Sequence, residues 1–395
     1  MSRKRILIVS EASDLHSDAV AWALRKKGHD CELLLTPDFP TLLGLSLRIG
    51  PDDLTGRFVL RGPGVVNEDR SAPFDTVWLR RPGGAVLPED MHPGDRQVAA
   101  RQCEIFLAGV APFLDRGAGT FWVNPPASDV AAQQKGCQLR SAARAGLKIP
   151  ETLISNDPAE IRAFLREHGG TVAHKLLRPA AWLAQDEEGG EHIYAAYTVP
   201  VSEDQLPDDD TLRLCPGIFQ PYLQKQFEVR VACLGDHLVA IRINSQTDDR
   251  AATDWRAGQI YVGMEPYDLP PDVAAACRRL LREFDLAHMS VDFVVDPDGE
   301  HTFLEINPQG QFLFLETRAG LPLLDMFSEF LVAGARDFTW RGDHEVVRFA
   351  EFEEVWDRTW RDEAARHAHL VRPLGAPDAE EEKELIHPEG PGVAR

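Results

Sequence analysis

Long apolar runs are missing from this chain of 395 residues, although 44% of its residues are hydrophobic. No stretch approaches the ~20 apolar residues that a membrane-spanning helix needs, so we expect no membrane segment. The N-terminus, MSRKRILIVSEAS, has a short basic start and only a brief apolar run, which Glu11 ends. This pattern is typical of a first β-strand rather than of a signal peptide, and it predicts a cytoplasmic protein.

Basic residues and paired cysteines are also scarce. Lys and Arg number 42 against 63 Asp and Glu, which gives a formal net charge of −21. A chain so acidic is poorly suited to a phosphate backbone, and we expect no nucleic-acid partner. The six cysteines, at positions 31, 103, 137, 215, 233 and 277, are far apart and form no CxxC pair. We therefore expect reduced thiols, with neither a structural zinc site nor a disulfide framework.

The familiar phosphate-binding loops are absent as well. The chain contains neither GxxxxGK[ST] nor GxGxxG, and it offers no Ser/His/Asp or Cys/His arrangement for nucleophilic catalysis. A nucleotide would have to be held in some other way, and a reaction would have to proceed without a side-chain nucleophile.

Alternating strand and helix patterns predict an α/β fold. A strand at Arg5–Val9, a helix at Ser17–Lys27 and a strand at Cys31–Leu35 form a βαβ opening, which is typical of a parallel sheet. A further strand, Thr76–Leu79, ends in Arg80 and Arg81. The Asn-Pro-Pro sequence at 124–126 then marks a boundary, so the first domain is predicted to cover residues 1–122.

Two lobes and an extension are predicted to follow, over residues 123–215, 216–334 and 335–395. The expected helices are Ser128–Ala145, Pro158–His168, Val273–Phe284 and Pro322–Val332. The expected strands are Thr171–Leu177, His192–Pro200, Gly217–Tyr222, Glu228–Leu234 and Leu238–Asn244. In the extension, Phe352, Trp356 and Trp360 recur every four residues, which favours a helix packed on the protein over a docking face. An acidic, disordered tail is expected after Pro377.

The segment SVDFVVDPDGEHTFLEINPQGQF, residues 290–312, predicts a β-hairpin whose acids face each other. Asp298-Gly299 favours a two-residue loop, which would place Asp292 directly opposite Glu305. Asn307 would share their face, because side chains alternate along a strand. The opposite, core-facing set would be Val291, Phe293, Val295, Leu304 and Ile306.

Two opposed carboxylates repel each other, so we expect a cation beside Asp292 and Glu305. Together with Asn307 they form an all-oxygen ligand set that suits Mg²⁺, and the alternative is an exposed acidic face of a sheet. Lys175, within an apolar strand, and Lys135, within a helix, are candidates for binding an anion. The ordinary alternatives are a lysine that reaches water from a strand edge and a solvated helix face.

The order of these segments resembles the ATP-grasp superfamily over residues 1–330. The resemblance rests on Lys135, VAHKLL with Lys175, IFQPYL, EVRVACLGDHLVAIRIN and the 290–312 hairpin. Other segments are similar to graspetide synthetases, the microviridin-type peptide macrocyclases, and to ribosomal-protein glutamate ligases: TPDFPT (36–41), VWLRRPGG (77–84), VNPP with KGCQL (123–139), GLKIPETLISNDP (146–158) and DWR (254–256). The sequence RPAAWLAQDEEGGEH, residues 178–192, departs from the small, Gly-rich phosphate flap of the family.

This resemblance implies an ATP-grasp fold with an N-terminal Rossmann-like domain and a C-terminal helical extension. The implied ATP-binding residues are Lys135, Lys175, Gln220, Pro221, Tyr222, Leu223 and Glu228. Those implied to steady the transferring phosphoryl group are Arg230 and Arg242. The implied ligands of two Mg²⁺ ions are Asp292, Glu305 and Asn307. The residues implied to contact substrate are Arg80, Arg81, Asp254 and Arg256.

The implied activity is an ATP- and Mg²⁺-dependent ligase that forms side-chain ester or amide crosslinks in a ribosomally made precursor peptide. One alternative is the addition of amino acids, such as glutamate, to a protein tail or a small acid. Another is a non-catalytic ATP-binding module, which the full set of metal and phosphate ligands disfavours. The oligomeric state is left open by the sequence, although the resemblance allows a homodimer, because dimers are common among such relatives.

Overall fold

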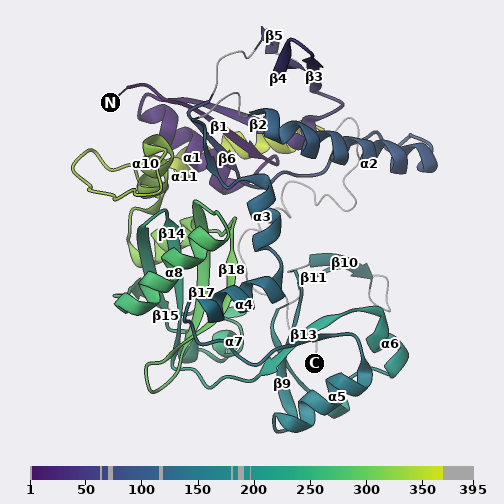
Figure 1. Cartoon of the computed structure of the whole chain (residues 1–395), viewed down its shortest axis with the longest axis vertical. Helices are drawn as coiled ribbons and strands as arrows, with labels where there is room; N and C mark the ends of the chain where they lie inside the picture. The colour runs from purple at the N-terminus through teal and green to yellow at the C-terminus, as the bar shows by residue number, and fades with distance from the viewer. Residues whose placement is uncertain are drawn as a thin grey trace.

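Five sheets and the helices around them make up the structure, a computed structural model in which residues 2–62, 65–69, 74–114, 119–178, 181–185, 191–195 and 197–367 are described. Figure 1 shows the N-terminal sheet at the top, a five-stranded sheet below it on the left, and a four-stranded sheet at the lower right. Among the described residues, no helix is both long and apolar enough to cross a membrane.

The N-terminal sheet is parallel, with the strand order β2-β1-β6-β7. Its strands are β1 (Arg5–Ser10), β2 (Asp30–Leu35), β6 (Thr76–Leu79) and β7 (Phe121–Val123). Its helices are α1 (Leu15–Lys26) and α2 (Pro93–Val110). The predicted βαβ opening is therefore confirmed, and Asp14 caps α1 by accepting a hydrogen bond from the Ser17 amide at 2.8 Å.

A small antiparallel sheet, between β2 and β6 in the sequence, was not predicted. Its strands are β3 (Gly44–Gly50), β4 (Asp53–Gly62) and β5 (Val65–Asp69). Short 3₁₀ helices flank several elements of the chain: η1 (Thr36–Asp38), η2 (Ala111–Leu114), η3 (Glu203–Gln205), η4 (Ser245–Thr247) and η5 (Trp255–Gly258).

The helix predicted over Ser128–Ala145 is two helices, and the break positions a candidate residue. They are α3 (Pro126–Ala132) and α4 (Lys135–Arg144). Lys135 is thus the first residue of α4, where a side chain can leave the helix, and not a residue midway along a solvated face. Gly146 follows α4 with φ +86°, a conformation that glycine adopts without strain.

The lower lobe is a four-stranded sheet in the order β12-β9-β13-β8, with two helices. These elements are β8 (Leu153–Ser155), α5 (Pro158–Glu167), β9 (Thr171–Leu176), β12 (Val199–Ser202), α6 (Asp209–Leu214) and β13 (Gly217–Pro221). The strand predicted over His192–Pro200 is divided between β12 and β11 (Glu191–Ala195), which pairs with β10 (Ala181–Gln185). Residues 179, 180 and 186–190 of the 178–192 segment lie outside the described residues.

The five-stranded antiparallel sheet carries the acidic hairpin. In spatial order it contains β16 (Met264–Pro266), β15 (His237–Ile243), β14 (Phe227–Leu234), β17 (His288–Val295) and β18 (His301–Asn307). One face packs on α8 (Pro271–Glu283) through Val229, Val231 and Val291. The other helices near this sheet are α7 (Asp249–Ala252) and α9 (Leu313–Ala319), whereas α10 (Leu323–Ala333) packs against α1 and β6 of the N-terminal sheet.

The C-terminal helix of the described chain packs against α1, one of the two helices of the N-terminal sheet. In α11 (Phe349–Ala364), Phe352 is 2% exposed and its ring lies 5.7 Å from that of Trp22 on α1. Trp356 is partly buried in the same core, whereas the side chain of Trp360 and the tail after Pro377 lie outside the described residues. The predicted packing role of this stripe is confirmed for Phe352.

Candidate active site

In the β17–β18 hairpin, the two predicted acids face each other as expected, but the loop and the strand register differ from the prediction. Asp292 lies opposite Glu305 and Ser290 opposite Asn307. The loop has three residues and not two, because the Asp296 amide donates to the Glu300 carbonyl at 3.1 Å. A bulge at Leu304 compensates for the extra loop residue and restores the predicted pairing.

The same bulge corrects the expectation for Leu304. Its neighbours Phe303 and Ile306 are buried in the core, whereas Leu304 is only partly buried and lines a pocket. The alternation of side chains that the prediction assumed ends where the bulge adds an unpaired residue.

Glu305 lies among several cations. The Lys135 ammonium is 2.5 Å from its carboxylate, and an Arg256 guanidinium nitrogen is 3.9 Å away. Burial would raise the pKa of Glu305, but the charges of Lys135, Lys175 and Arg256 outweigh burial and lower it to about 2. Glu305 is therefore ionised at neutral pH. Burial lowers the pKa of Lys175, an effect that the charge of Glu305 opposes.

Asp292 is paired with a different cation. One nitrogen of Arg230 lies 3.0 Å from each Asp292 oxygen, and both side chains are buried. Burial raises the pKa of Asp292, the Arg230 charge lowers it, and the nearby charge of Glu305 raises it again. The Glu305 charge therefore still acts on Asp292, as the expected repulsion requires, although Asp292 is paired with Arg230 and Glu305 with Lys135.

This donor set fits a hard divalent cation. Carboxylate oxygens on directly opposed residues, with an amide oxygen two residues further along β18, are ligands that Mg²⁺ accepts. In the described part of the chain, no group of three or more His, Cys, Asp or Glu residues could hold a metal ion. A metal at this position would therefore need Asn307, water or phosphate oxygens to complete its coordination.

Gln138 holds Lys135 in reach of Glu305, and sequence reasoning missed it. Its amide nitrogen donates to the Ile306 carbonyl at 2.9 Å, and its amide oxygen accepts from the Ile306 amide at 3.1 Å. This two-way contact fixes α4 against β18. The available signal was spacing: Gln138 lies three residues after Lys135, on the same face of the helix.

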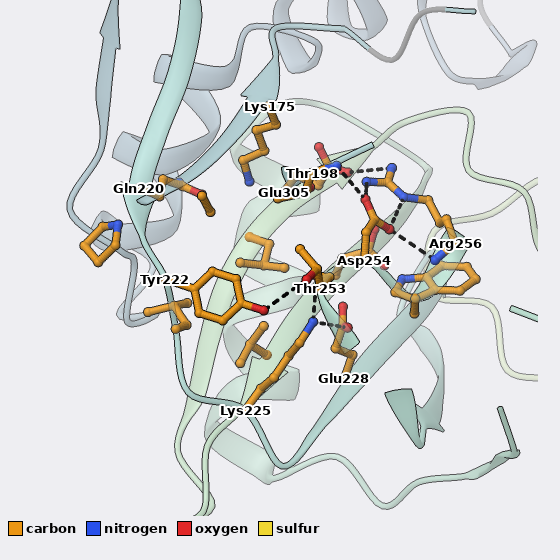
Figure 2. A pocket seen from close by; sticks show the side chains of 17 residues that line it. Lys175, Thr198, Gln220, Tyr222, Lys225, Glu228, Thr253, Asp254, Arg256 and Glu305 are labelled. Carbon is orange, nitrogen blue, oxygen red and sulfur yellow. Dashed lines mark hydrogen bonds and ion pairs between the residues drawn. The ribbon is translucent and has the colours of Figure 1, made fainter. Parts of the chain in front are cut away.

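A pocket opens between the lower lobe and the five-stranded sheet, beside this ionic cluster (Figure 2). The predicted residues that line it are Lys175, Gln220, Pro221, Tyr222, Leu223, Glu228, Asp254, Arg256, Asp292 and Glu305. The lining residues that were not predicted are Ala173, Thr198, Lys225, Thr253, Trp255, Val294 and Leu304. The pocket therefore unites most of the candidates from both lobes.

At the end of the pocket away from Asp292 and Glu305, the lining side chains are fixed by polar contacts with one another. Lys225, whose side chain is 8% exposed and which sequence reasoning missed, donates to Glu228 at 2.7 Å and to the Thr253 carbonyl at 2.9 Å. Burial raises the pKa of Glu228, and Lys225 counteracts this. The Tyr222 hydroxyl lies 3.1 Å from that of Thr253, and Figure 2 shows both beside Lys225. The only signal for Lys225 was its position three residues before Glu228.

Asp254 aims Arg256 at the ionic cluster. Its carboxylate accepts hydrogen bonds from two guanidinium nitrogens of Arg256, at 2.8 and 2.7 Å, and from the Thr198 amide at 3.1 Å. Burial would raise the pKa of Asp254, but Arg256 outweighs burial and lowers it. This fork–fork pairing fixes the guanidinium plane. Arg256, a predicted substrate residue, is thus directed at Glu305.

Similar solved structures share this fold over nearly the whole chain. The macrocyclase MdnC from Microcystis aeruginosa, bound to its precursor peptide MdnA, is 30% identical, with a TM-score of 0.71 over 84% of this chain and 100% of its own. A peptide-associated ATP-grasp ligase from Chryseobacterium gregarium, in complex with ADP and a leader and core peptide, is 27% identical, with a TM-score of 0.72 over 86% and 100% of the two chains. The macrocyclase MdnB from M. aeruginosa is 27% identical, with a TM-score of 0.67 over 83% and 99%. The chain belongs to the ATP-grasp superfamily. No protein-family model and no curated protein matches the sequence.

In this ATP-grasp ligase, the predicted residue Arg242 lies on the opposite face of the five-stranded sheet from Arg230. Arg230 pairs with Ile241 across β14 and β15, so Arg242, one residue on, points to the opposite face of the sheet. Its guanidinium lies 4.0 Å from the centre of the Phe227 ring and its Nε donates to Asn244 at 2.8 Å. Strand alternation therefore places Arg242 on the other face of the sheet from Arg230 and from Asp292, which lines the pocket.

The two arginines that end β6 have different surroundings. Arg80 is 0% exposed, pairs with Asp14 at 3.1 Å and donates to the Gln309 carbonyl, so the structure does not leave it on a surface where a peptide could reach it. The side chain of Arg81 is 43% exposed, and its nearest acids, Glu11 and Asp14, are 3.9 Å away.

Asn307, the third predicted metal ligand, is exposed at the end of β18, and its side-chain oxygen accepts a hydrogen bond from the Gln309 amide at 3.0 Å.

Proposed function

We propose that this ATP-grasp ligase joins carboxylate side chains of a ribosomally made precursor peptide to hydroxyl or amine side chains of the same peptide. The observation that carries the proposal is the ionic cluster at the pocket, where Glu305 and Asp292 lie among Lys135, Lys175 and Arg256. Its support from outside the chain comes from relatives 27 to 30% identical whose structures contain precursor, leader or core peptides.

The chemistry explains why such a cluster is needed. A carboxylate does not react with an amine or a hydroxyl in water, because oxide is too poor a leaving group. In the proposed reaction, a peptide carboxylate oxygen attacks the γ-phosphorus of ATP, ADP leaves, and an acyl phosphate forms. The peptide hydroxyl or amine then attacks the acyl carbon, loses its proton and expels phosphate. Positioning and charge stabilisation can supply the catalysis without a side-chain nucleophile.

The residues of the cluster take the following roles in this proposal. Lys135 and Lys175 bind phosphate oxygens of ATP, and Arg256 and Arg230 stabilise the charge on the transferring phosphoryl group and on the acyl phosphate. Asp292, Glu305 and Asn307 would hold the two Mg²⁺ ions. When bound, these ions neutralise phosphate charge and align the reacting groups. Arg242 has no part, because it lies on the other face of the sheet.

The far end of the pocket takes the nucleoside. The backbone of Gln220, Pro221, Tyr222 and Leu223 reads adenine, and Glu228 accepts the ribose hydroxyls. Gln220 is fixed for this role, since its side chain is buried and donates to the Thr152 hydroxyl at 2.9 Å. Lys225 counteracts the rise that burial causes in the pKa of Glu228, and it orients the carboxylate.

The remaining expectations belong to the same proposal. Residues 1–122 form a Rossmann-like domain, 123–215 and 216–334 the two lobes around ATP, and 335–395 a helical extension. Arg81 contacts the peptide, and the buried Asp254 contributes by orienting Arg256. The enzyme is a cytoplasmic homodimer that does not bind nucleic acid.

The test is a mass measurement. The purified protein is incubated with ATP, Mg²⁺ and the peptide from a short reading frame beside its gene that is rich in Thr, Ser, Lys, Asp and Glu. We expect the peptide to lose the mass of one water for each bond formed, with release of ADP and phosphate. An unchanged peptide while glutamate is added to a protein tail would favour the alternative ligase. Nucleotide binding without any turnover would favour the non-catalytic module.

A further inference from the structure

Arg80 connects the N-terminal sheet to the loop that carries Asn307. Its side chain is fully buried, its Nε donates to Asp14 at 3.1 Å, and its Nη1 donates to the backbone carbonyl of Gln309. Asp14 is itself fixed, because it caps α1 through the Ser17 amide. The guanidinium is thus held by a rigid helix start on one side and holds the loop after β18 on the other.

The loop at 307–312 is fixed from several further directions. Asn124 donates to the Pro308 carbonyl at 2.9 Å and to the His288 carbonyl at 2.8 Å. A Cβ added to Gly310 would lie 2.0 Å from the Ser290 hydroxyl, so the backbone lies directly against β17. The Gln309 amide, in turn, donates to the side-chain oxygen of Asn307.

His16 holds the end of the same loop from α1. Its Nε2 accepts hydrogen bonds from the amides of Phe312 at 2.9 Å and Leu313 at 3.2 Å. A neutral imidazole is required for this, and burial, followed by the charge of Arg80, keeps the pKa of His16 well below its usual value. Two side chains at the N-terminal sheet therefore contact a loop that starts at a proposed metal ligand.

We infer that Arg80 is a positioning residue: through the Gln309 carbonyl it fixes the orientation of Asn307 and thereby the affinity of the nucleotide complex for its divalent cation. This inference rests on the proposed metal role of Asn307. An arginine suits the position because its planar fork reaches Asp14 and the carbonyl at once, whereas a lysine offers a single ammonium group. Outer-shell contacts of this kind orient metal ligands and tune the affinity for the ion.

The test measures Mn²⁺ binding in the presence of a non-hydrolysable ATP analogue, followed by the electron paramagnetic resonance of the ion. For Arg80→Met we expect Mn²⁺ affinity to fall about 10- to 100-fold, with the affinity for the analogue alone unchanged. The matched control is Lys27→Met. Lys27, the C-cap residue of α1, also forms a buried ion pair, but its partner at 2.7 Å is Asp325 on α10 and not the 307–312 loop. It should lose stability while its Mn²⁺ affinity stays that of the wild type.

Two further variants keep the test decisive if Arg80→Met does not fold. Arg80→Lys should retain one of the two contacts and weaken Mn²⁺ binding to an intermediate degree, and His16→Ala should weaken it by releasing the other end of the loop. Wild-type Mn²⁺ affinity in the folded Arg80 variants overturns the inference. A wild-type protein that binds the analogue but no Mn²⁺ overturns the proposed metal set, and this inference with it.

Discussion

Glu305→Gln isolates the charge at the centre of the site while keeping the shape of the side chain. The surrounding cations lower the pKa of Glu305 from 4.5 to about 2, and the side chain is only 19% exposed, so solvent screens this effect little. Since one pKa unit corresponds to about 1.4 kcal/mol, the folded state favours the ionised carboxylate by roughly 3 kcal/mol. We expect the variant to lose up to about 3 kcal/mol of unfolding free energy at neutral pH.

The lowered pKa of Glu305 also fixes the direction in which the stability difference between wild type and variant changes with pH. The pKa of Glu305 is lower in the folded than in the unfolded chain, so its contribution is present above pH 4.5 and is lost as the pH falls towards about 2. The stability difference between wild type and variant should therefore be full at neutral pH and shrink below pH 4.5. Urea unfolding, followed by tryptophan fluorescence across this range, measures it.

Glu300→Gln is the matched control on the same strand pair. Glu300 lies 2.7 Å from Lys148, but the two side chains are 62% and 52% exposed, so this change should cost only about 0 to 1 kcal/mol. Equal stability of Glu305→Gln and wild type at neutral pH would refute the electrostatic reasoning. In the peptide assay, Glu305→Gln should also lower kcat about 100-fold or more, because a proposed metal ligand is weakened.

Two further predictions concern ionisable groups, Glu228 at the pocket and His288 in the protein core. Lys225→Met leaves Glu228 buried without its cation, so we expect a loss of about 3 kcal/mol in unfolding free energy and a raised KM for ATP; unchanged values for both would contradict the pairing. Burial lowers the pKa of His288 from 6.5 to about 4, so its stabilising effect is complete above pH 6.5 and is lost as the pH falls towards 4. The wild type should lose up to about 3 kcal/mol over that range, and His288→Gln should lose less; parallel stability curves for the two would disprove the role of His288.

The hairpin shows both the reach and the limit of sequence reasoning. Alternation and the Asp298-Gly299 turn predicted the facing of Asp292 and Glu305 correctly, yet the loop is one residue longer than predicted. A bulge at Leu304 adds one unpaired residue to β18, and this restores the predicted pairing of Asp292 with Glu305. Turn residues restrict the loop to a few types, but only the packing of both faces of the strands selects the register.

Arg242 could have been placed from the sequence by the same argument. Gly235-Asp236 is a turn signal between two predicted strands, and a two-residue loop there pairs Arg230 with Ile241, as the structure has it. Arg242 must then face away from Arg230. The burial of Arg80, in contrast, depends on Asp14 and Gln309, which lie far from it in the sequence, and no local pattern brings these three together.

The distribution of charge explains how one site can hold so many ionisable groups. Burying a single charge is costly, and here each buried acid has a basic partner: Glu305 has Lys135, Asp292 has Arg230, Asp254 has Arg256 and Glu228 has Lys225. The pairs that would meet phosphate, Lys135–Glu305 and Arg230–Asp292, are also those beside the proposed metal ligands. Adding ATP together with Mg²⁺ supplies anions to the bases and cations to the acids at once, so neither set is left unpaired. Nucleotide alone would satisfy the bases but leave Asp292 and Glu305 with weaker partners, and we therefore expect nucleotide and metal ion to bind cooperatively.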